Sequence, residues 1–268
     1  MIAAALTIAG SDPSGGAGIQ ADLKTFHQFG VYGEAAIALL TVQNTLGVSA
    51  IELVTGPIIR QQVEAVFADI RPAAIKTGAL GGEDAIQTVA ELAAGFECPL
   101  VVDPVMVSTS GHRLLAADAE RAMRDLLLPR CTLATPNIAE AQVLSGVSIA
   151  NVQDAGEAAQ RIGRLGASAV LVKGGHLEDD ATDVLYFGGA LHHFPGKRVH
   201  TRHTHGSGCT YSAAITALLA KGYELIPAIR IAKAFVQRAI ETAPGLGRGA
   251  GPLNHFANTA DDSTCASS

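Results

Sequence analysis

A glycine-rich turn that carries an ionisable side chain lies directly before an apolar segment of the sequence. The turn spans residues 204–210 (THGSGCT), and the residues after it predict a helix over 207–220. The first N–H groups of a helix have no partner within it, so the turn can bind an anion such as a transferring phosphate. Cys209 lies where the positive end of the helix dipole stabilises a thiolate. The pattern favours phosphoryl transfer, although this segment alone also fits an ordinary glycine turn.

Composition limits the class of protein to which the chain can belong. The 268 residues are 48% hydrophobic and 16% charged, which suits one large α/β domain with an aliphatic core. The net charge of −6 argues against a nucleic-acid or membrane surface. The four cysteines lie far apart without a CxxC pair, and the first residues lack the positive leader of a signal peptide. We therefore expect a cytoplasmic protein.

Short apolar runs alternate with segments of helical periodicity, which predicts a doubly wound, mostly parallel α/β sheet flanked by helices. The strands are expected at residues 2–9, 35–41, 50–54, 73–76, 100–103, 131–134 and 169–172. Residues 184–187 and 191–194 flank Gly188-Gly189 and predict a small antiparallel hairpin. In such a sheet the site lies at the carboxyl ends of the strands. We expect a single domain over residues 1–256 and a disordered tail over residues 257–268.

The glycine-rich loop after the first strand approaches two nucleotide-binding motifs and completes neither. Gly10 and Gly15 fit a Walker A loop, but Gly16 stands where that motif has lysine. Gly16, Gly18 and Ala21 fit the GxGxx(G/A) pattern of NAD-binding folds, but the acidic residue expected after the next strand is missing. An NAD-dependent oxidoreductase is therefore a disfavoured alternative.

The segments at the predicted strand ends together resemble a known family. They are residues 10–24 (GSDPSGGAGIQADLK), 43–45 (QNT), 103–106 (DPVM), 135–140 (TPNIAE), 172–176 (VKGGH) and 205–210 (HGSGCT). Their order and spacing, over residues 5–256, are similar to the hydroxymethylpyrimidine/phosphomethylpyrimidine kinases of thiamine biosynthesis, in the ribokinase-like superfamily. The resemblance implies ATP- and magnesium-dependent phosphorylation of 4-amino-5-hydroxymethyl-2-methylpyrimidine, and then of its monophosphate to the diphosphate.

The resemblance gives the cysteine turn a catalytic role. The backbone N–H groups of Gly206, Ser207, Gly208 and Cys209 would hold the oxygens of the transferring group. Most ribokinase relatives carry an aspartate base at the position of Cys209, and a thiolate here would accept the proton of the substrate hydroxyl. For phosphoryl transfer, a protein mainly has to position the reacting groups and neutralise the charge of the phosphates.

Substrate contacts follow from the same resemblance. Asp22 and Gln43 correspond to pyrimidine contacts, because a carboxylate accepts from an exocyclic amine and an amide both donates and accepts. Gly10 and Val107 would add backbone contacts. Ala79 stands where some relatives carry methionine against the ring, which leaves the pocket roomier.

The resemblance also implies nucleotide and metal residues. Asp103 and Glu140 would organise Mg²⁺, through water. ATP would meet a further set of four residues. This set is Lys173, Asn137, Thr204 and Arg248.

Several alternatives and partners stay open at this stage. A pyridoxal or pyridoxine kinase is the main alternative, since both substrates are flat heteroaromatic alcohols; Gln43 favours the pyrimidine, whereas Ala79 admits a larger ring. A ligand sensor without activity is a further possibility. The five histidines between residues 192 and 205 lack a zinc-ligand pattern and are expected to be scattered over the surface. We expect a homodimer, because the aliphatic content leaves apolar surface to spare.

Overall fold

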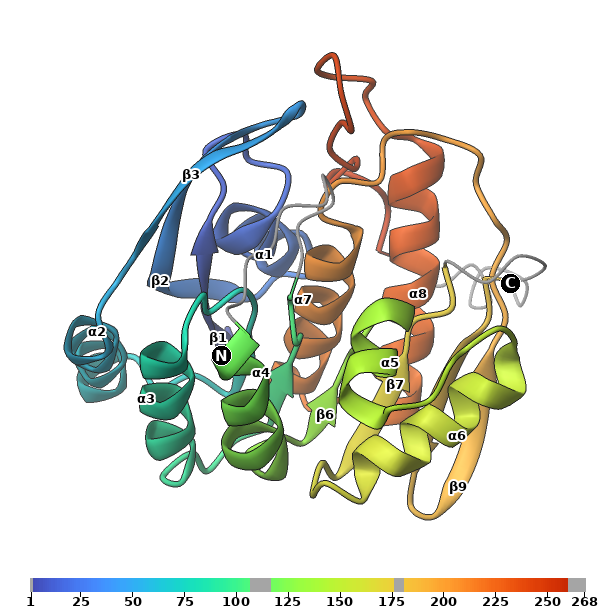
Figure 1. The fold of residues 1–268 in the computed structure, drawn as a ribbon. Coiled ribbons are helices and arrows are strands. Elements are labelled where there is room, and N and C mark those ends of the chain that lie inside the picture. Colours follow the sequence, from blue (N-terminus) through green and yellow to red (C-terminus); the bar gives the residue numbers. More distant parts are fainter. Residues whose placement is uncertain (1, 107–116, 176–180, 260–268) are drawn as a thin grey trace.

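The computed structural model describes residues 2–106, 117–175 and 181–259, and its strands form one sheet (Figure 1). Val107, His176 and residues 260–268 of the predicted tail lie outside the described residues. Within them, the strand order is β3-β2-β1-β4-β5-β6-β7-β8-β9. The strands are β1 (Ala4–Ser11), β2 (Tyr32–Asn44), β3 (Gly47–Leu53), β4 (Ala74–Thr77), β5 (Leu100–Val102), β6 (Leu133–Ala134), β7 (Ala169–Val172), β8 (Asp183–Phe187) and β9 (Ala190–Phe194).

Helices cover both faces of this sheet, which confirms the doubly wound α/β class. They are α1 (Gly18–Gln28), α2 (Gly56–Asp69), α3 (Glu83–Ala93), α4 (Ala117–Ala122), α5 (Ile138–Ser145), α6 (Val152–Gly163), α7 (Ser207–Ala220) and α8 (Leu225–Glu241). A π-helical turn (Met123–Leu127) and a 3₁₀ turn (Leu128–Arg130) follow α4.

The two faces of the sheet have separate apolar cores. Helices α2 to α6 pack over one core and α1, α7 and α8 over the other (Figure 1). Alternate residues of β1 enter opposite cores: Leu6 and Ile8 face the first, and Ala5 faces the second. The core is aliphatic and is built largely from alanine, leucine, isoleucine and valine, as the composition predicts.

Strands β2, β1, β4, β5, β6 and β7 run parallel to one another, and the carboxyl ends of these strands meet at one edge. The predicted hairpin is confirmed as β8 and β9, which pair antiparallel across Gly188-Gly189. A second hairpin was not predicted: β2 and β3 pair antiparallel around a turn at Thr45-Leu46. The prediction ended the first of these strands at Thr41, where polar residues begin, but the backbone pairing with β3 continues to Asn44 and needs no apolar side chain there.

No helix within the described residues is long and apolar enough to cross a membrane.

Candidate active site

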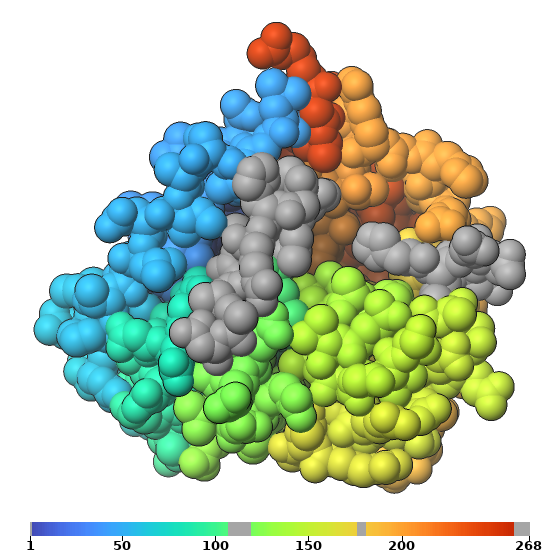
Figure 2. All heavy atoms as spheres, in the orientation of Figure 1, coloured from blue at the N-terminus to red at the C-terminus, as the bar shows by residue number. Residues whose placement is uncertain are grey.

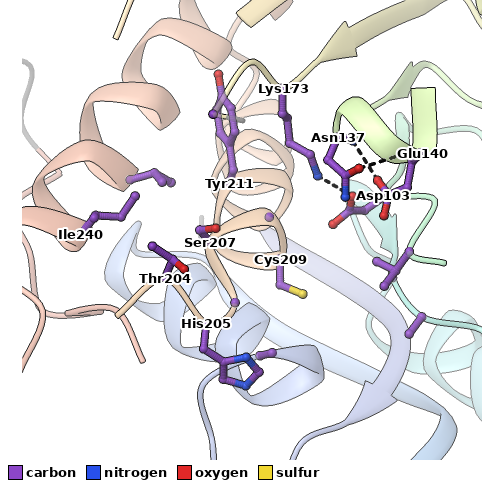
Figure 3. A pocket seen from close by; sticks show the side chains of 18 of the residues that line it. Asp103, Asn137, Glu140, Lys173, Thr204, His205, Ser207, Cys209, Tyr211 and Ile240 are labelled. Atoms are coloured by element: carbon purple, nitrogen blue, oxygen red, sulfur yellow. Dashed lines mark hydrogen bonds and ion pairs between the residues drawn. The ribbon is translucent and has the colours of Figure 1, made fainter. Parts of the chain in front are cut away.

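A pocket of about 650 Å³ lies at the carboxyl ends of the parallel strands and at the start of α7 (Figure 3). Its volume falls in the range of small-molecule sites. Most of the residues predicted for the site line this pocket. They are Gly10, Gln43, Ala79, Asp103, Asn137, Glu140, Lys173, Thr204, Gly206, Ser207, Gly208 and Cys209. Asp22 and Arg248 do not line it.

The predicted anion-binding turn forms the N-terminus of α7. Gly206 precedes the helix with φ +79°, and a Cβ at this position would collide with the carbonyl oxygen of Gly16, so only glycine fits. The N–H of Ser207 donates to Thr204 O at 3.1 Å and is not available to a phosphate, which corrects the expectation for this residue. Among the described residues, no backbone acceptor receives the N–H groups of Gly208 and Cys209. These two groups can bind the transferring oxygens.

Cys209 lies in the pocket between His205 and the Asp103–Lys173 side of the site (Figure 3). Burial raises the pKa of its thiol to about 11; Lys76 opposes this rise, and the carboxylates of Asp22 and Asp103 add to it. From the helix dipole, the sequence analysis predicted that the pKa of this thiol would be lowered. The dipole is outweighed because the thiol is desolvated near two acidic groups.

Asp22 is completely buried, and it corrects the expectation of a direct pyrimidine contact. Its Oδ2 accepts a hydrogen bond from Thr7 Oγ1 at 2.7 Å and lies 2.9 Å from Lys76 Nζ. Lys76 in turn lies beneath the pocket wall, since a Cβ added to Gly78 would be 3.2 Å from its Nζ. The helical position of Asp22 faces the sheet, where a lysine of β4 balances its charge, and not the pocket.

Polar residues gather on the other side of Cys209, among them Asp103, Asn137, Glu140 and Lys173 (Figure 3). Lys173 Nζ donates to Asp103 Oδ1 at 2.8 Å, and Thr135 Oγ1 donates to the same oxygen at 3.3 Å. Asn137 and Glu140 form a capping box at the start of α5: Asn137 Oδ1 accepts the N–H of Glu140, and Glu140 Oε2 accepts the N–H of Asn137.

The electrostatics of this group match a site for charged phosphates and a cation. Burial raises the pKa of Glu140 to about 7, with Lys173 opposing the rise and Asp103 adding to it. Burial disfavours the charged form of Lys173, but Asp103 and Glu140 outweigh burial and raise its pKa. The lysine is therefore positively charged beside the pocket, where it can neutralise phosphate oxygens.

The oxygen donors of this group fit Mg²⁺ held through water. Asp103 Oδ2 contacts Ser212 Oγ at 3.3 Å, and Glu140 already caps a helix, so neither carboxylate is arranged for a tight inner coordination sphere. Among the described residues, no three His, Cys, Asp or Glu side chains form a cluster that would hold a metal directly. A hydrated Mg²⁺ keeps its water ligands and uses such carboxylates as acceptors.

A buried polar cluster on the α8 side of the pocket was missed by the sequence analysis. Asp183 accepts the N–H of Gly174 at 2.8 Å and the hydroxyl of Tyr211 at 3.0 Å, and lies 2.7 Å from Lys233 Nζ. Asp183 is the first residue of β8 and belongs to none of the motifs found in the sequence. Only the tertiary fold brings it to the site. The cluster holds Gly174, which directly follows Lys173, against α7 and α8.

The loop over residues 244–252 does not bring Arg248 to the described pocket. The Gly249 N–H donates to Thr45 Oγ1 at 3.3 Å, which places this loop against the β2–β3 turn, and Arg248 is exposed. Figure 2 shows this loop, in red, beside the blue β2–β3 hairpin. Arg248 therefore does not line the pocket, and its nucleotide contact stays a prediction.

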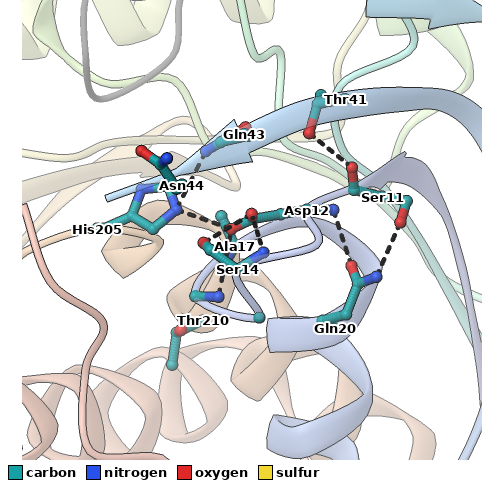
Figure 4. Close-up of polar contacts among 12 residues, drawn as sticks. Ser11, Asp12, Ser14, Ala17, Gln20, Thr41, Gln43, Asn44, His205 and Thr210 are labelled. Atoms are coloured by element: carbon teal, nitrogen blue, oxygen red, sulfur yellow. Dashed lines mark hydrogen bonds and ion pairs between the residues drawn. The ribbon is translucent and has the colours of Figure 1, made fainter. Parts of the chain in front are cut away.

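A chain of contacts links the loop after β1 to Gln43, and it too was missed by the sequence analysis (Figure 4). His205 Nε2 lies 2.8 Å from Asp12 Oδ2 and 3.2 Å from the side-chain amide of Gln43. His205 is buried, which corrects the expectation that it is a surface histidine. Burial acts to raise the pKa of Asp12, but hydrogen bonds from His205 and Ser14 outweigh it and hold the pKa below its usual value.

Fold and site together define a small-molecule kinase of the ribokinase-like class. The family model for phosphomethylpyrimidine kinase matches residues 12–254. The chain belongs to the phosphomethylpyrimidine kinase family, as the motifs predict.

Relatives and solved structures agree with this assignment. The hydroxymethylpyrimidine/phosphomethylpyrimidine kinase of Rhizobium meliloti is 49% identical, with 96% of this chain and 98% of the relative covered. An ADP complex of Bacillus subtilis pyridoxal kinase matches with a TM-score of 0.88 and 40% identity, covering 96% of this chain and 98% of the other. The phosphomethylpyrimidine kinase of Clostridium difficile matches with a TM-score of 0.80 and 42% identity, covering 89% and 99%.

Proposed function

We propose that the protein transfers the γ-phosphoryl group of ATP to 4-amino-5-hydroxymethyl-2-methylpyrimidine and then to its monophosphate, as a step of thiamine biosynthesis. The observation that carries the proposal is a pocket in which His205, in contact with Gln43, lies on one side of Cys209 and the Asp103–Lys173 pair lies on the other. A heterocycle held by Gln43 thus has its hydroxyl near Cys209 and the start of α7. The family and its relatives support the choice of substrate.

Different residues of the pocket have different roles in the phosphoryl transfer. The N–H groups of Gly208 and Cys209 orient the transferring group, and Lys173 neutralises its charge. Mg²⁺, when bound, offsets the negative charge of the ATP phosphates, and Asp103 and Glu140 would hold its water ligands. In the transfer to the alcohol, Cys209 accepts the proton of the attacking hydroxyl in its thiolate form, which the raised pKa of the thiol makes the minor form in the ligand-free protein.

A coupled ATP-turnover assay with Mg²⁺ tests the proposal. It offers hydroxymethylpyrimidine, its monophosphate and pyridoxal in parallel, with and without the metal. We expect turnover with both pyrimidines, and a Cys209→Ala variant that binds ATP normally but loses about 10²- to 10⁴-fold in turnover. Absence of turnover with either pyrimidine contradicts the proposal.

Pyridoxal is a second candidate substrate because two observations favour it. Ala79 leaves open the part of the pocket that a larger side chain would fill, and a pyridoxal kinase is among the most similar solved structures. Turnover with pyridoxal alone would move the assignment to vitamin B6 phosphorylation. Turnover with all three compounds would describe a kinase with a broad substrate range.

The proposal also includes a homodimer and a cytoplasmic setting. Leu40, Val42 and Leu46 expose 47%, 61% and 59% of their surface on the β2–β3 hairpin, which offers an apolar face to a second copy. Cys98, Cys131 and Cys209 are all free thiols, which suits a reducing compartment that also supplies ATP.

A further inference from the structure

The protons of the contact chain around His205 can be assigned from its geometry. The Asp12 carboxylate accepts three backbone N–H groups and one hydroxyl from its own loop, so it is ionised and can only accept hydrogen bonds. His205 Nε2, 2.8 Å from Asp12 Oδ2, must therefore donate. Nε2 carries a proton whether the imidazole ring is neutral or positively charged.

A protonated Nε2 determines which atom of Gln43 can face it. The Gln43 amide lies 3.2 Å from Nε2, and an amide NH₂ at this place would set one donor against another. A half-turn of the amide group exchanges its oxygen and nitrogen without moving the rest of the side chain. With Oε1 toward His205, the Nε2 proton is shared between Asp12 and Gln43. The NH₂ group of Gln43 then points away from the histidine.

We propose that the Asp12–His205 pair fixes the orientation of the Gln43 amide, so that Gln43 presents a hydrogen-bond donor to the substrate. This inference rests on the proposed function and deepens it. The substrate that fits carries an unprotonated ring nitrogen opposite Gln43, as a pyrimidine does. A ring N–H or an amine at that place meets a second donor and is rejected. Asp12 and His205 are thus positioning residues that determine specificity through Gln43.

The pair is rigid enough to hold this orientation before a substrate binds. Asp12 exposes 3% of its surface and His205 exposes 5%. A Cβ on Gly16 would be 2.6 Å from His205 Cδ2, so the ring is packed tightly against that glycine. The backbone N–H of His205 donates to Gly251 O at 3.1 Å, which fixes the residue from the other side. An oriented donor costs little to organise when the ligand arrives.

Substitution of His205 gives a test with a built-in control. In His205→Leu the ionised Asp12 becomes the nearest acceptor, so the Gln43 NH₂ turns toward it and Oε1 turns to the pocket. In His205→Gln the new side chain still offers an N–H to both neighbours. Substrates for the assay are the hydroxymethylpyrimidine and two analogues, each with one ring nitrogen replaced by C–H.

For the wild type, we expect kcat/KM to be about tenfold or more lower for the analogue that lacks the nitrogen facing Gln43 than for the hydroxymethylpyrimidine, mainly because KM is higher. His205→Leu is expected to reduce this discrimination to about twofold, and His205→Gln to keep it within about threefold of the wild type. A His205→Leu variant that discriminates as the wild type does overturns the proposal.

Nuclear magnetic resonance of the ligand-free protein tests the same orientation without any turnover. We expect ¹⁵N spectra to show a protonated Nε2 on His205, and the Gln43 NH₂ protons, assigned with Gln43→Ala, to give no strong nuclear Overhauser effect to the imidazole ring. An unprotonated Nε2, or a strong effect between the NH₂ and the ring, contradicts the proposal. Because no substrate is present, these spectra decide the orientation even if the protein phosphorylates no pyrimidine.

Discussion

Lys76 Nζ lies 2.9 Å from Asp22 Oδ2, and neither side chain is exposed to solvent. Burial disfavours the charged form of Lys76, but Asp22 outweighs burial and raises the pKa of the lysine. Thr7 Oγ1 donates to the same carboxylate oxygen at 2.7 Å. The pair thus places two opposite charges directly beneath the pocket that contains Cys209.

Removal of one partner of this pair should destabilise the whole fold. Lys76→Met leaves the Asp22 carboxylate buried without its counter-charge, and we expect a loss of about 3–5 kcal/mol in the free energy of unfolding. Urea denaturation at neutral pH measures it. The double variant Asp22→Leu/Lys76→Met should recover much of the loss. A matched control is Arg71→Ala, since the exposed Arg71–Glu97 pair should contribute about 1 kcal/mol or less. An equal loss of unfolding free energy in Lys76→Met and Arg71→Ala would contradict the conclusion that Lys76 balances a buried charge.

The thiol of Cys209 should show a high pKa in its reactivity. The pKa of this thiol is about 11. At pH values below the pKa, the thiolate fraction increases about tenfold for each unit by which the pH rises. We therefore expect the rate of alkylation of Cys209 by iodoacetamide, followed by mass spectrometry of its peptide, to climb steadily from pH 7 to pH 10. The peptide that contains Cys98, a half-buried thiol whose pKa is also raised by burial, provides the comparison in the same samples. A plateau near pH 7 to 8 would show that the helix dipole prevails over burial after all.

Sequence patterns predicted the fold and most of the pocket because both depend on local features. Periodicity locates the strands and helices, and the glycines of the turn before Cys209 mark the start of α7. Asp22 was assigned wrongly because its partner Lys76 is 54 residues away, in a strand that reads as apolar. The hydrogen bond between His205 and Asp12 joins residues separated by 193 positions. Only the packing of α7 beside the loop after β1 brings them together.

His255 should make the stability of the protein depend on pH. Burial, followed by the charge of Lys24, lowers the pKa of its imidazole to about 4. The unfolded chain protonates this histidine near pH 6.5, so the folded state loses stability as the pH falls from about 6.5 to about 4. The full effect is about 3 kcal/mol.

Unfolding free energies of the wild type and His255→Asn, compared at pH 7.5 and pH 4.5, measure this dependence. We expect the wild type to lose about 2–3 kcal/mol more than the variant on acidification. The imidazole lies 3.2 Å from Thr210 Oγ1, so Thr210→Val controls for loss of that contact alone. Equal losses in wild type and His255→Asn would show that the histidine does not carry the pH dependence.

The room left by Ala79 should set the tolerance for large substrates. Ala79→Met fills the part of the pocket against the ring, and we expect kcat/KM for pyridoxal to fall by about 10-fold or more relative to the pyrimidine. The KM for ATP serves as the internal control, because the nucleotide is expected on the far side of Cys209. An equal loss for both heterocycles would mean that Ala79 does not discriminate between them.

The exposed apolar residues of the β2–β3 hairpin lead to a prediction about assembly. Leu40 and Val42 lie two positions apart on β2, so their side chains point to the same face of the hairpin, where both are exposed. Water-exposed apolar surface of this kind is a frequent site of contact between copies of one chain. We expect the wild type to be a dimer by size-exclusion chromatography with light scattering. Leu40→Lys/Val42→Lys should convert it to a folded monomer with an unchanged circular dichroism spectrum.

Val143 provides the control for this experiment, since it is exposed to 46% on α5, away from the hairpin. Val143→Lys adds a charge at a comparable apolar site and should leave the dimer intact. A wild type that elutes as a monomer at micromolar concentration contradicts the dimer itself. A dimer that survives the double substitution on β2 but dissociates in Val143→Lys would move the interface from the hairpin to α5. Under both of these outcomes, the exposed apolar face of the hairpin is not a contact between two copies of the chain.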